Sequence, residues 1–187
     1  MTVVPYDASM KERLRYICRC TGPLEAVTDP EGVGRYITDC YCDYSAECEP
    51  DNCFALLDDA GTVMGYTLCA PDYKRYRRAF APYLRRILAN PRSEKLEVRA
   101  EQIALRVFSP LYPAHLHIDL LDEATGQGGG TQLMNRLLDH LRAQKVPRVM
   151  LIVGSGNKDA IRFYRRFGFR RLIAGGGGTV MGLRLDK

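Results

Sequence analysis

The sequence predicts an α/β domain, and three stretches of the chain lead to that prediction. Residues 114–121 alternate apolar and polar side chains, as a half-buried strand does, and residues 133–141 then repeat apolar side chains at helical spacing. Residues 149–153, VMLIV, form a second apolar strand, and residues 53–57 and 62–70 indicate a strand hairpin. Strands and amphipathic helices that alternate in this way are typical of a sheet covered by helices.

Composition and charge limit the classes of function. With 187 residues, 46% hydrophobic and 26% charged, the chain is long enough for a single domain with a substantial core, which we expect to span residues 1–187. No apolar run approaches the roughly 20 residues that a membrane span needs. The N-terminus lacks the pattern of a secretory signal, so a cytoplasmic protein is expected. The net charge of +5 suits an anionic ligand, and no motif indicates a nucleic-acid binder.

Seven cysteines lie within the first seventy residues. The pairs Cys18/Cys20 and Cys40/Cys42 lack the Cys-x-x-Cys spacing of zinc knuckles, and they stand in helical patterns beside apolar residues. The odd count and the expected intracellular context favour free thiols. We therefore predict no metal site.

The N-terminal part predicts one strand and two helices. The strand covers residues 2–6, a helix capped by Ser9 runs to about residue 20, and a second helix covers about 30–44. The side chains expected to face inward are Leu14, Ile17 and Cys18 in the first helix, and Val33, Tyr36, Ile37 and Cys40 in the second.

An insertion over about 72–112 separates the hairpin, with its turn at residues 58–61, from the strand at 114. One helical face of the insertion carries Tyr76, Phe80, Leu84 and Leu88, and the remainder carries Lys74, Arg75, Arg77, Arg78, Arg85 and Arg86. Two interpretations stay open. The insertion is either an amphipathic helix with a solvated basic face, or a lid over a binding site or a surface for an acidic partner.

The stretch from 114 to 141 carries the strongest functional signal. In its strand, one face presents His115, His117 and Asp119, and the other presents Leu116, Ile118 and Leu120. The turn that follows reads Gly126-Gln127-Gly128-Gly129-Gly130-Thr131 and leads into the helix. Backbone N–H groups left uncovered by side chains converge there at the positive end of the helix dipole, which favours an anionic phosphate.

The turn does not match two other phosphate-binding motifs. A Walker loop is excluded because no Lys-Ser or Lys-Thr pair follows the last glycine, and the dinucleotide spacing fails at Thr131 and Leu133. A flexible strand-to-helix turn without a ligand stays open on the loop alone.

The C-terminal part predicts a strand at 149–153, a helix and a closing hairpin. Asn157 is expected to cap the helix, which carries Ile161, Tyr164 and Phe167. The hairpin pairs residues 169–173 with 179–185 around Gly175-Gly176-Gly177-Gly178, which we expect to be a flexible loop.

Two motifs together resemble the GCN5-related N-acetyltransferase (GNAT) superfamily. Its pyrophosphate loop, Arg/Gln-x-x-Gly-x-Gly/Ala, is similar to residues 125–130, although Thr125 stands where Arg or Gln is usual and Gln127 is the substitute we expect. Its later motif, Asn-x-x-Ala-x-x-Phe-Tyr-x-x-x-Gly-Phe, is matched by Asn157, Ala160, Phe163, Tyr164, Gly168 and Phe169. The resemblance is specific over about 114–185 and looser over 53–70. More loosely, the insertion and its flanks resemble acetyltransferase-like domains that accompany some O-GlcNAc hydrolases.

This resemblance implies a GNAT fold: a mixed, mostly antiparallel sheet flanked by helices, with splayed fourth and fifth strands and a helical insertion before the fourth. It also implies that acetyl-CoA is the co-substrate and that the acetyl group passes directly to an amine in a ternary complex. A backbone N–H near Leu120 or Leu121 would polarise the thioester carbonyl. The implied cofactor-binding residues are Leu120, Leu121, Gly126, Gln127, Gly128, Gly129, Gly130, Thr131, Asn157 and Tyr164.

The resemblance gives Tyr164 the role of proton donor to the leaving sulfur, the alternative being a packed aromatic residue. For the general base, Asp119 and His117 share a strand face, and His117 lies nearer the required pKa. The alternative is that both are structural and paired with Arg148 or Arg162. His140, on the helix after the glycine turn, is expected to face solvent.

The acceptor is not identified by the sequence. By the resemblance, the segment around residues 41–49 borders the acceptor pocket, so Tyr41, Asp43, Tyr44, Glu47 and Glu49 are candidate substrate contacts, with a solvated acidic loop as the alternative. The acidic residues among them would suit a cationic amine, whereas the basic insertion would suit an anionic one. A catalytically silent acyl-CoA-binding or regulatory module, whose basic insertion docks a partner, is the alternative function. Thr125 favours that module, and Asn157 and Tyr164 favour the enzyme. A homodimer through the closing hairpin stays open.

Overall fold

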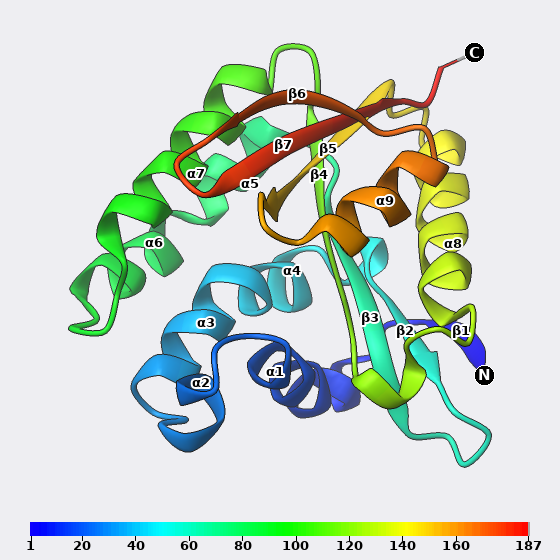
Figure 1. The fold of residues 1–187 in the computed structure, drawn as a ribbon, viewed down its shortest axis with the longest axis horizontal. Helices are drawn as coiled ribbons and strands as arrows, with labels where there is room; N and C mark the ends of the chain where they lie inside the picture. Colours follow the sequence, from blue (N-terminus) through cyan, green and yellow to red (C-terminus); the bar gives the residue numbers. More distant parts are fainter. Residues whose placement is uncertain (187) are drawn as a thin grey trace.

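The computed structural model describes residues 1–186, and within them seven strands form one sheet in the order β1-β2-β3-β4-β5-β7-β6 (Figure 1). The strands are β1 (Thr2–Pro5), β2 (Phe54–Leu57), β3 (Val63–Ala70), β4 (Ala114–Leu120), β5 (Arg148–Gly154), β6 (Arg170–Gly175) and β7 (Gly178–Arg184). Of the neighbouring pairs, only β4 and β5 are parallel. The predicted mixed, mostly antiparallel sheet is thus confirmed.

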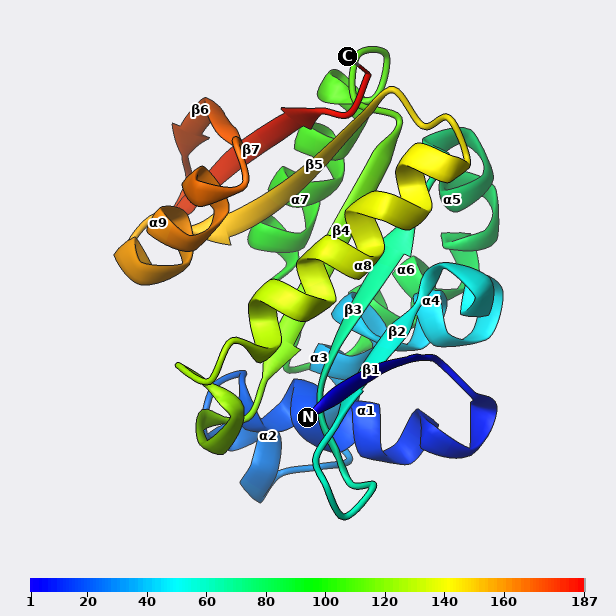
Figure 2. The same ribbon diagram turned by 90° about the vertical axis from the view of Figure 1, so that its right-hand side faces the viewer.

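Helices cover both faces of the sheet (Figure 2). One face packs against α1 (Lys11–Cys20), α2 (Glu25–Thr28), α3 (Val33–Tyr41), α4 (Asp43–Cys48), α5 (Tyr73–Ala79), α6 (Ala81–Ala89) and α7 (Lys95–Phe108). The other packs against α8 (Gly129–Ala143) and α9 (Lys158–Arg166). Because successive strand residues point to opposite faces, Ala55 of β2 joins the first core cluster, and Phe54 and Leu56 join the second.

The strands β4 and β5 separate soon after they meet. They pair at Ala114 with Val149 and at His115 with Met150, and no further pairing holds the remainder of β4 to β5. On its other side β4 stays paired with β3 as far as Leu120. The predicted splay between the fourth and fifth strands is therefore present, and it opens towards the glycine turn before α8 (Figure 1).

Two predictions for the N-terminal helices were wrong. Asp7, not Ser9, accepts the capping hydrogen bond, because a short 3₁₀ turn (Ala8–Met10) precedes α1 and the Ser9 N–H donates to the Asp7 carboxylate. The single helix predicted over 30–44 is two helices, α3 and α4, which are divided at Cys42, where φ is −121°. The inward-facing residues Leu14, Ile17, Cys18, Tyr36 and Ile37 are buried as predicted.

The insertion and the closing hairpin also differ from expectation. The insertion folds into three helices, and Tyr76 and Phe80 are buried in the core beneath them. The glycine run is a tight hairpin turn and not a flexible loop. Gly176 and Gly177 take positive φ values of 58° and 83°, so that Gly175 pairs directly with Gly178. No helix in the described part of the chain is long and apolar enough to cross a membrane.

Candidate functional site

The glycine turn before α8 is held by its own side chains. Gly126 and Gly128 take φ values of 77° and 84°, a region that non-glycine residues rarely adopt. The Gln127 Nε2 donates to the Glu123 carbonyl at 2.6 Å, and the Thr125 hydroxyl donates to the Leu121 carbonyl at 3.2 Å. Gln127 thus stabilises the turn, and Thr125 anchors its beginning.

The same turn leaves donors available to a ligand. Helix α8 is 15 residues long, and its N-cap, Gly128, provides no side-chain cap for the first N–H groups. A side-chain carbon added at Gly126 or Gly128 would meet nothing within 4 Å, so the space above the turn is open. Uncapped N–H groups at a helix N-terminus below open space fit a diphosphate.

The backbone of β4 presents a further donor inside the splay. The Leu121 N–H donates to the Met64 carbonyl of β3 at 2.9 Å. Because N–H groups alternate between the two sides of an antiparallel strand, the N–H of Leu120 points away from β3, towards the gap beside β5. Two backbone N–H groups were predicted to polarise the thioester carbonyl. That of Leu121 is already bonded within the sheet, so that of Leu120 is the one that remains for this role.

Asn157 and Tyr164 are the predicted site residues at the N-cap and within α9. The Asn157 side chain caps the helix as predicted, accepting from the Ala160 N–H at 3.0 Å. About two turns later, the ring of Tyr164 packs edge-on against Phe163 and Phe169, and the residue is 9% exposed. Burial, and then the charge of Asp119, raise the pKa of Tyr164, so its hydroxyl keeps its proton at neutral pH.

Asp119 and His117 form a side-chain hydrogen bond with each other on β4. The His117 Nε2 lies 2.8 Å from the Asp119 Oδ2, and the Tyr66 hydroxyl of β3 donates to the same oxygen at 2.6 Å. Burial opposes the charge on each member, but the ion pair prevails: it raises the pKa of His117 and lowers that of Asp119. Neither residue pairs with Arg148 or Arg162, the two arginines that the structural alternative named as examples.

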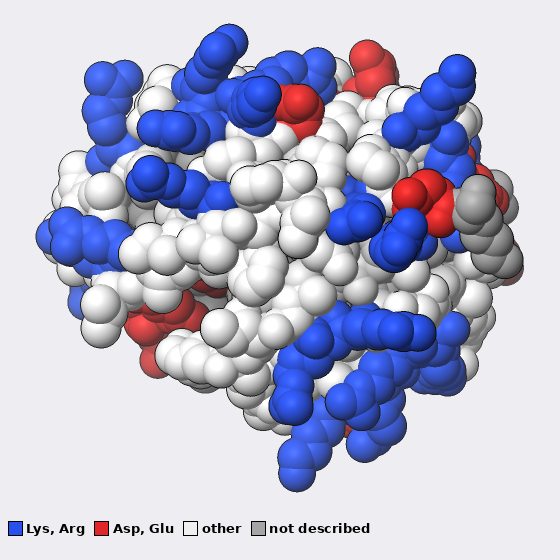
Figure 3. Space-filling model, turned by 90° about the horizontal axis from the view of Figure 1, so that it is seen from above, with Lys and Arg blue, Asp and Glu red and all other residues white. Residues whose placement is uncertain are grey.

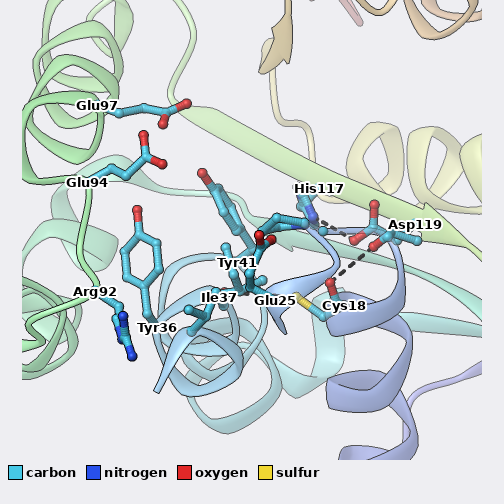
Figure 4. A pocket seen from close by; sticks show the side chains of 14 residues that line it. Cys18, Glu25, Tyr36, Ile37, Tyr41, Arg92, Glu94, Glu97, His117 and Asp119 are labelled. Atoms are coloured by element: carbon cyan, nitrogen blue, oxygen red, sulfur yellow. Dashed lines mark hydrogen bonds and ion pairs between the residues drawn. The ribbon is translucent and has the colours of Figure 1, made fainter. Parts of the chain in front are cut away.

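Two cavities meet at His117 on the face covered by α1 to α7. The outer cavity, of about 570 Å³, lies among α1, α3 and the start of α7, and Figure 4 shows Glu94 and Glu97 on one side of it and the His117–Asp119 pair on the other. The inner cavity, of about 290 Å³, lies between α7 and the separated strands β4 and β5. Tyr41, Glu97 and His117 line both, so these side chains form the boundary between them.

The predicted acceptor contacts divide into two groups. Tyr41 lines both cavities and Tyr44 lines the inner one. The carboxylates of Asp43, Glu47 and Glu49 line neither cavity, and each is occupied by a cationic partner: Arg15, Lys11 and Arg75, respectively. These three residues are structural, which corrects their assignment as substrate contacts.

His140 was also wrongly placed by the sequence pattern. Its Nε2 lies 3.0 Å from the Asn52 Oδ1, and its ring packs edge-on against Phe54. The ring is therefore held against β2 and does not face solvent freely.

Residues that sequence reasoning missed come from the insertion and from β3. Glu94, Glu97 and Glu101 lie at a spacing of three and four around α7, and the Tyr41 hydroxyl donates to the Glu101 Oε1 at 3.1 Å. That spacing is visible in the sequence and predicts one acidic helix face. Tyr66 carried no such signal, because its contact with Asp119 depends on the pairing of β3 with β4.

Charge and metal-binding capacity complete the description of the site. Within residues 1–186, no group of three potential metal ligands is close enough to hold an ion, and the seven cysteines are free thiols. On the face seen from above, Lys and Arg gather in groups and outnumber Asp and Glu (Figure 3). The exposed basic residues of α9 and β6 are Lys158, Arg162, Arg165, Arg166, Arg170 and Arg171.

Known proteins share the sequence pattern and the fold of this chain. Residues 22–169 match the model of the Acetyltransferase (GNAT) family. The chain is 29% identical to SsHAT, whose crystal structure it matches with a TM-score of 0.82 over 100% of this chain and 98% of that one.

More distant solved structures share the fold. The PaiA N-acetyltransferase from Thermoplasma acidophilum, solved in complex with coenzyme A, is 13% identical, with a TM-score of 0.60 and coverage of 98% of both chains. The ribosomal-protein-S18-alanine N-acetyltransferase from Escherichia coli is 15% identical, with a TM-score of 0.56 and coverage of 100% of this chain and 94% of that one.

Proposed function

This chain belongs to the GNAT family of acetyltransferases, and from that premise we propose that it transfers the acetyl group of acetyl-CoA to an amine by direct attack in a ternary complex. The observation that carries the proposal is the gap between β4 and β5. The glycine turn lies at one side of this gap, and the two cavities lie at the other. In this proposal residues 1–187 act as one domain, with the insertion 72–112 forming part of the acceptor side.

We assign acetyl-CoA to the α8 and α9 side of the gap. The N–H groups from Gly126 to Thr131 would bind the diphosphate, with Gln127 holding the turn in shape. The exposed cations of α9 and β6 favour an anionic nucleotide nearby. Asn157 supports this side indirectly, because its cap fixes the start of the helix that carries Tyr164.

Three groups would then serve the transfer. The amine nitrogen forms a bond to the acetyl carbonyl carbon, and the bond from that carbon to sulfur breaks. The N–H of Leu120 stabilises the negative charge that develops on the carbonyl oxygen, since it points into the gap. Tyr164, kept protonated by burial, donates to the departing sulfur. The pair of His117 and Asp119 stands at the inner end of the outer cavity, where an acceptor amine would approach.

The outer cavity favours a cationic acceptor. Glu25, Glu94, Glu97 and Asp119 line it. Of the basic residues in the lining, Arg92 lies 3.7 Å from Asp29 outside the lining, and His117 is paired with Asp119, which leaves the three glutamates in excess. Between the acidic and basic sequence cues, this lining supports the proposal of an amine that binds as an ammonium ion. The arginines at 77, 78 and 85 are exposed on α5 and α6 and line neither cavity.

One experiment separates the enzyme from a silent acyl-CoA-binding module. Purified protein is tested for thermal stabilisation by acetyl-CoA and for release of free thiol with a panel of mono- and polyamines and anionic amines as acceptors. We expect stabilisation together with thiol release that is fastest with polyamines. Stabilisation without turnover on any acceptor would support the module, and neither response would contradict both.

A further inference from the structure

Glu101 lies where the inserted helix meets the gap between the strands. It projects from α7 and lines the inner cavity, together with His117 of β4 and with Leu151 and Ile152 of β5. Glu97 is the other carboxylate of the insertion in this lining, and it also lines the outer cavity. No ion pair joins Glu101 to a Lys or Arg of residues 1–186, in contrast to Asp43, Glu47 and Glu49.

Tyr41 connects Glu101 to the strand pair. The Tyr41 hydroxyl donates to the Glu101 Oε1 at 3.1 Å, and its ring stacks on the His117 imidazole with centroids 5.2 Å apart. Within the described residues, no protein hydrogen bond reaches the Oε2 of Glu101. The carboxylate is thus fixed through one oxygen, and the other oxygen is available to a group in the cavity.

We propose that Glu101 is the general base that takes the proton from the acceptor ammonium, in place of Asp119 or His117. The inference rests on the acetyl transfer proposed above, and it assigns to the insertion a catalytic function.

The strand pair is less suited to this step. The Asp119 Oδ2 already accepts from His117 and Tyr66, and these bonds help to lower its pKa, which makes it a weaker base. The His117 Nε2 is engaged with Asp119. In this assignment the two residues position Tyr41, through its stacking on His117, and so position Glu101.

The surroundings of Glu101 suit a base at neutral pH. Burial raises its pKa to about 7, the charge of Glu97 adds to that rise, and the Tyr41 hydrogen bond and His117 oppose it. The titratable groups that face Glu101 from the packed elements are Tyr41 and Cys40 of α3, Tyr76 of α5, Glu97 of α7 and His117 of β4. A carboxyl group with this pKa is ionised in a large fraction of molecules at physiological pH and can still hold the proton it receives.

Each proton that moves in this reaction has a donor and an acceptor. The ammonium gives one proton to the Glu101 carboxylate, and the neutral amine forms the C–N bond as the C–S bond breaks. Tyr164 gives its proton to sulfur, so that CoA leaves as the thiol. The nitrogen then loses a second proton, which restores Tyr164 through solvent, and Glu101 releases its proton to solvent. The products are the amide, the thiol and one proton.

Glu101→Gln tests the assignment while keeping an acceptor oxygen for Tyr41. We expect kcat to fall by about 100-fold or more, with unchanged acetyl-CoA affinity by calorimetry and an unchanged unfolding temperature. The matched control is Asp139→Asn, which removes an exposed carboxylate of α8 and should keep the wild-type rate. An active Glu101→Gln enzyme, within threefold of wild type, would overturn the assignment and leave the proposed function standing.

Tyr41→Phe provides an independent test if Glu101→Gln is unstable. Its hydroxyl lowers the pKa of Glu101, so its removal should move the acidic limb of kcat, measured from about pH 5 to 9, to higher pH, whatever the height of the remaining plateau. A limb that stays in place would contradict the role of Glu101. A wild-type protein that binds acetyl-CoA without turnover would instead remove the proposed function, and the assignment with it.

Discussion

The two faces of the sheet organise their chemistry in different ways. On the face of α8 and α9, the groups assigned to acetyl-CoA are mainly backbone N–H groups within one continuous stretch, from Leu120 to Thr131. On the face of α1 to α7, the groups around the cavities are side chains from α1, α3, α7 and β4, which are far apart in sequence. A ligand bound by backbone geometry leaves a local sequence motif, whereas a pocket built from distant side chains leaves none.

The largest expected effect comes from a variant that disrupts only the acetyl-CoA site proposed at the start of α8. Gly128→Asp places a negative charge at the helix N-terminus, where a diphosphate would bind, and should weaken acetyl-CoA binding by about 100-fold or more in calorimetry. Gly61→Asp is the matched control, because Gly61 has nearly the same φ, 82° against 84°, and equally open space, in the β2–β3 turn. Both variants should lose similar stability. Equal acetyl-CoA affinity in the two would refute the diphosphate site.

A second variant tests the residue proposed to act between the two sides of the gap. Tyr164→Phe removes the hydroxyl assigned to the departing sulfur and should lower kcat by about 100-fold, with little change in acetyl-CoA affinity. The control is Tyr112→Phe, because Tyr112 lies in the loop before β4 and lines neither cavity. If Tyr164→Phe turned over at the wild-type rate, Tyr164 would be only a packed aromatic residue.

A third variant concerns only the α1 to α7 side. Asp119→Asn removes the charge that raises the pKa of His117, so burial should dominate and lower that pKa below its ordinary value. His115 is the internal reference in the same NMR titration, since burial alone lowers its pKa to about 4. The His117 signal should therefore shift towards the behaviour of His115. A pKa that did not fall would show that Asp119 does not control the imidazole.

The smallest effect expected is on stability. Asn157→Ala removes the side-chain cap of α9 and should cost about 1 kcal/mol, or roughly 2–4 °C in Tm. Asn90→Ala is a comparison on the other face, because the Asn90 amide donates to the Gly32 carbonyl outside the α9 region. Only Asn157→Ala should also reduce kcat, since α9 carries Tyr164. Equal kcat in both variants would show that the Asn157 cap does not contribute to catalysis.

The contrast between the faces also explains what the sequence could predict. The strand, glycine turn and helix from 114 to 141 and the Asn157 cap follow from local patterns, and the structure confirms each of them. The break at Cys42 has no Gly or Pro to announce it, so periodicity joined two helices into one.

The acceptor side required tertiary information. The acidic face of α7 could be counted from its spacing, but its position over the separated strands could not, because it depends on how three insertion helices pack. The ion pairs that occupy Asp43 and Glu49 likewise come from α1 and α5, and no local pattern indicates them.

The most direct test of this account is a crystal structure of the protein with acetyl-CoA bound. The diphosphate should lie on the N–H groups that follow Thr125, and the acetyl carbonyl should accept from the Leu120 N–H in the gap between β4 and β5, beside Tyr164. A nucleotide bound on another surface, or an acetyl group outside that gap, would contradict the assignment of the two faces.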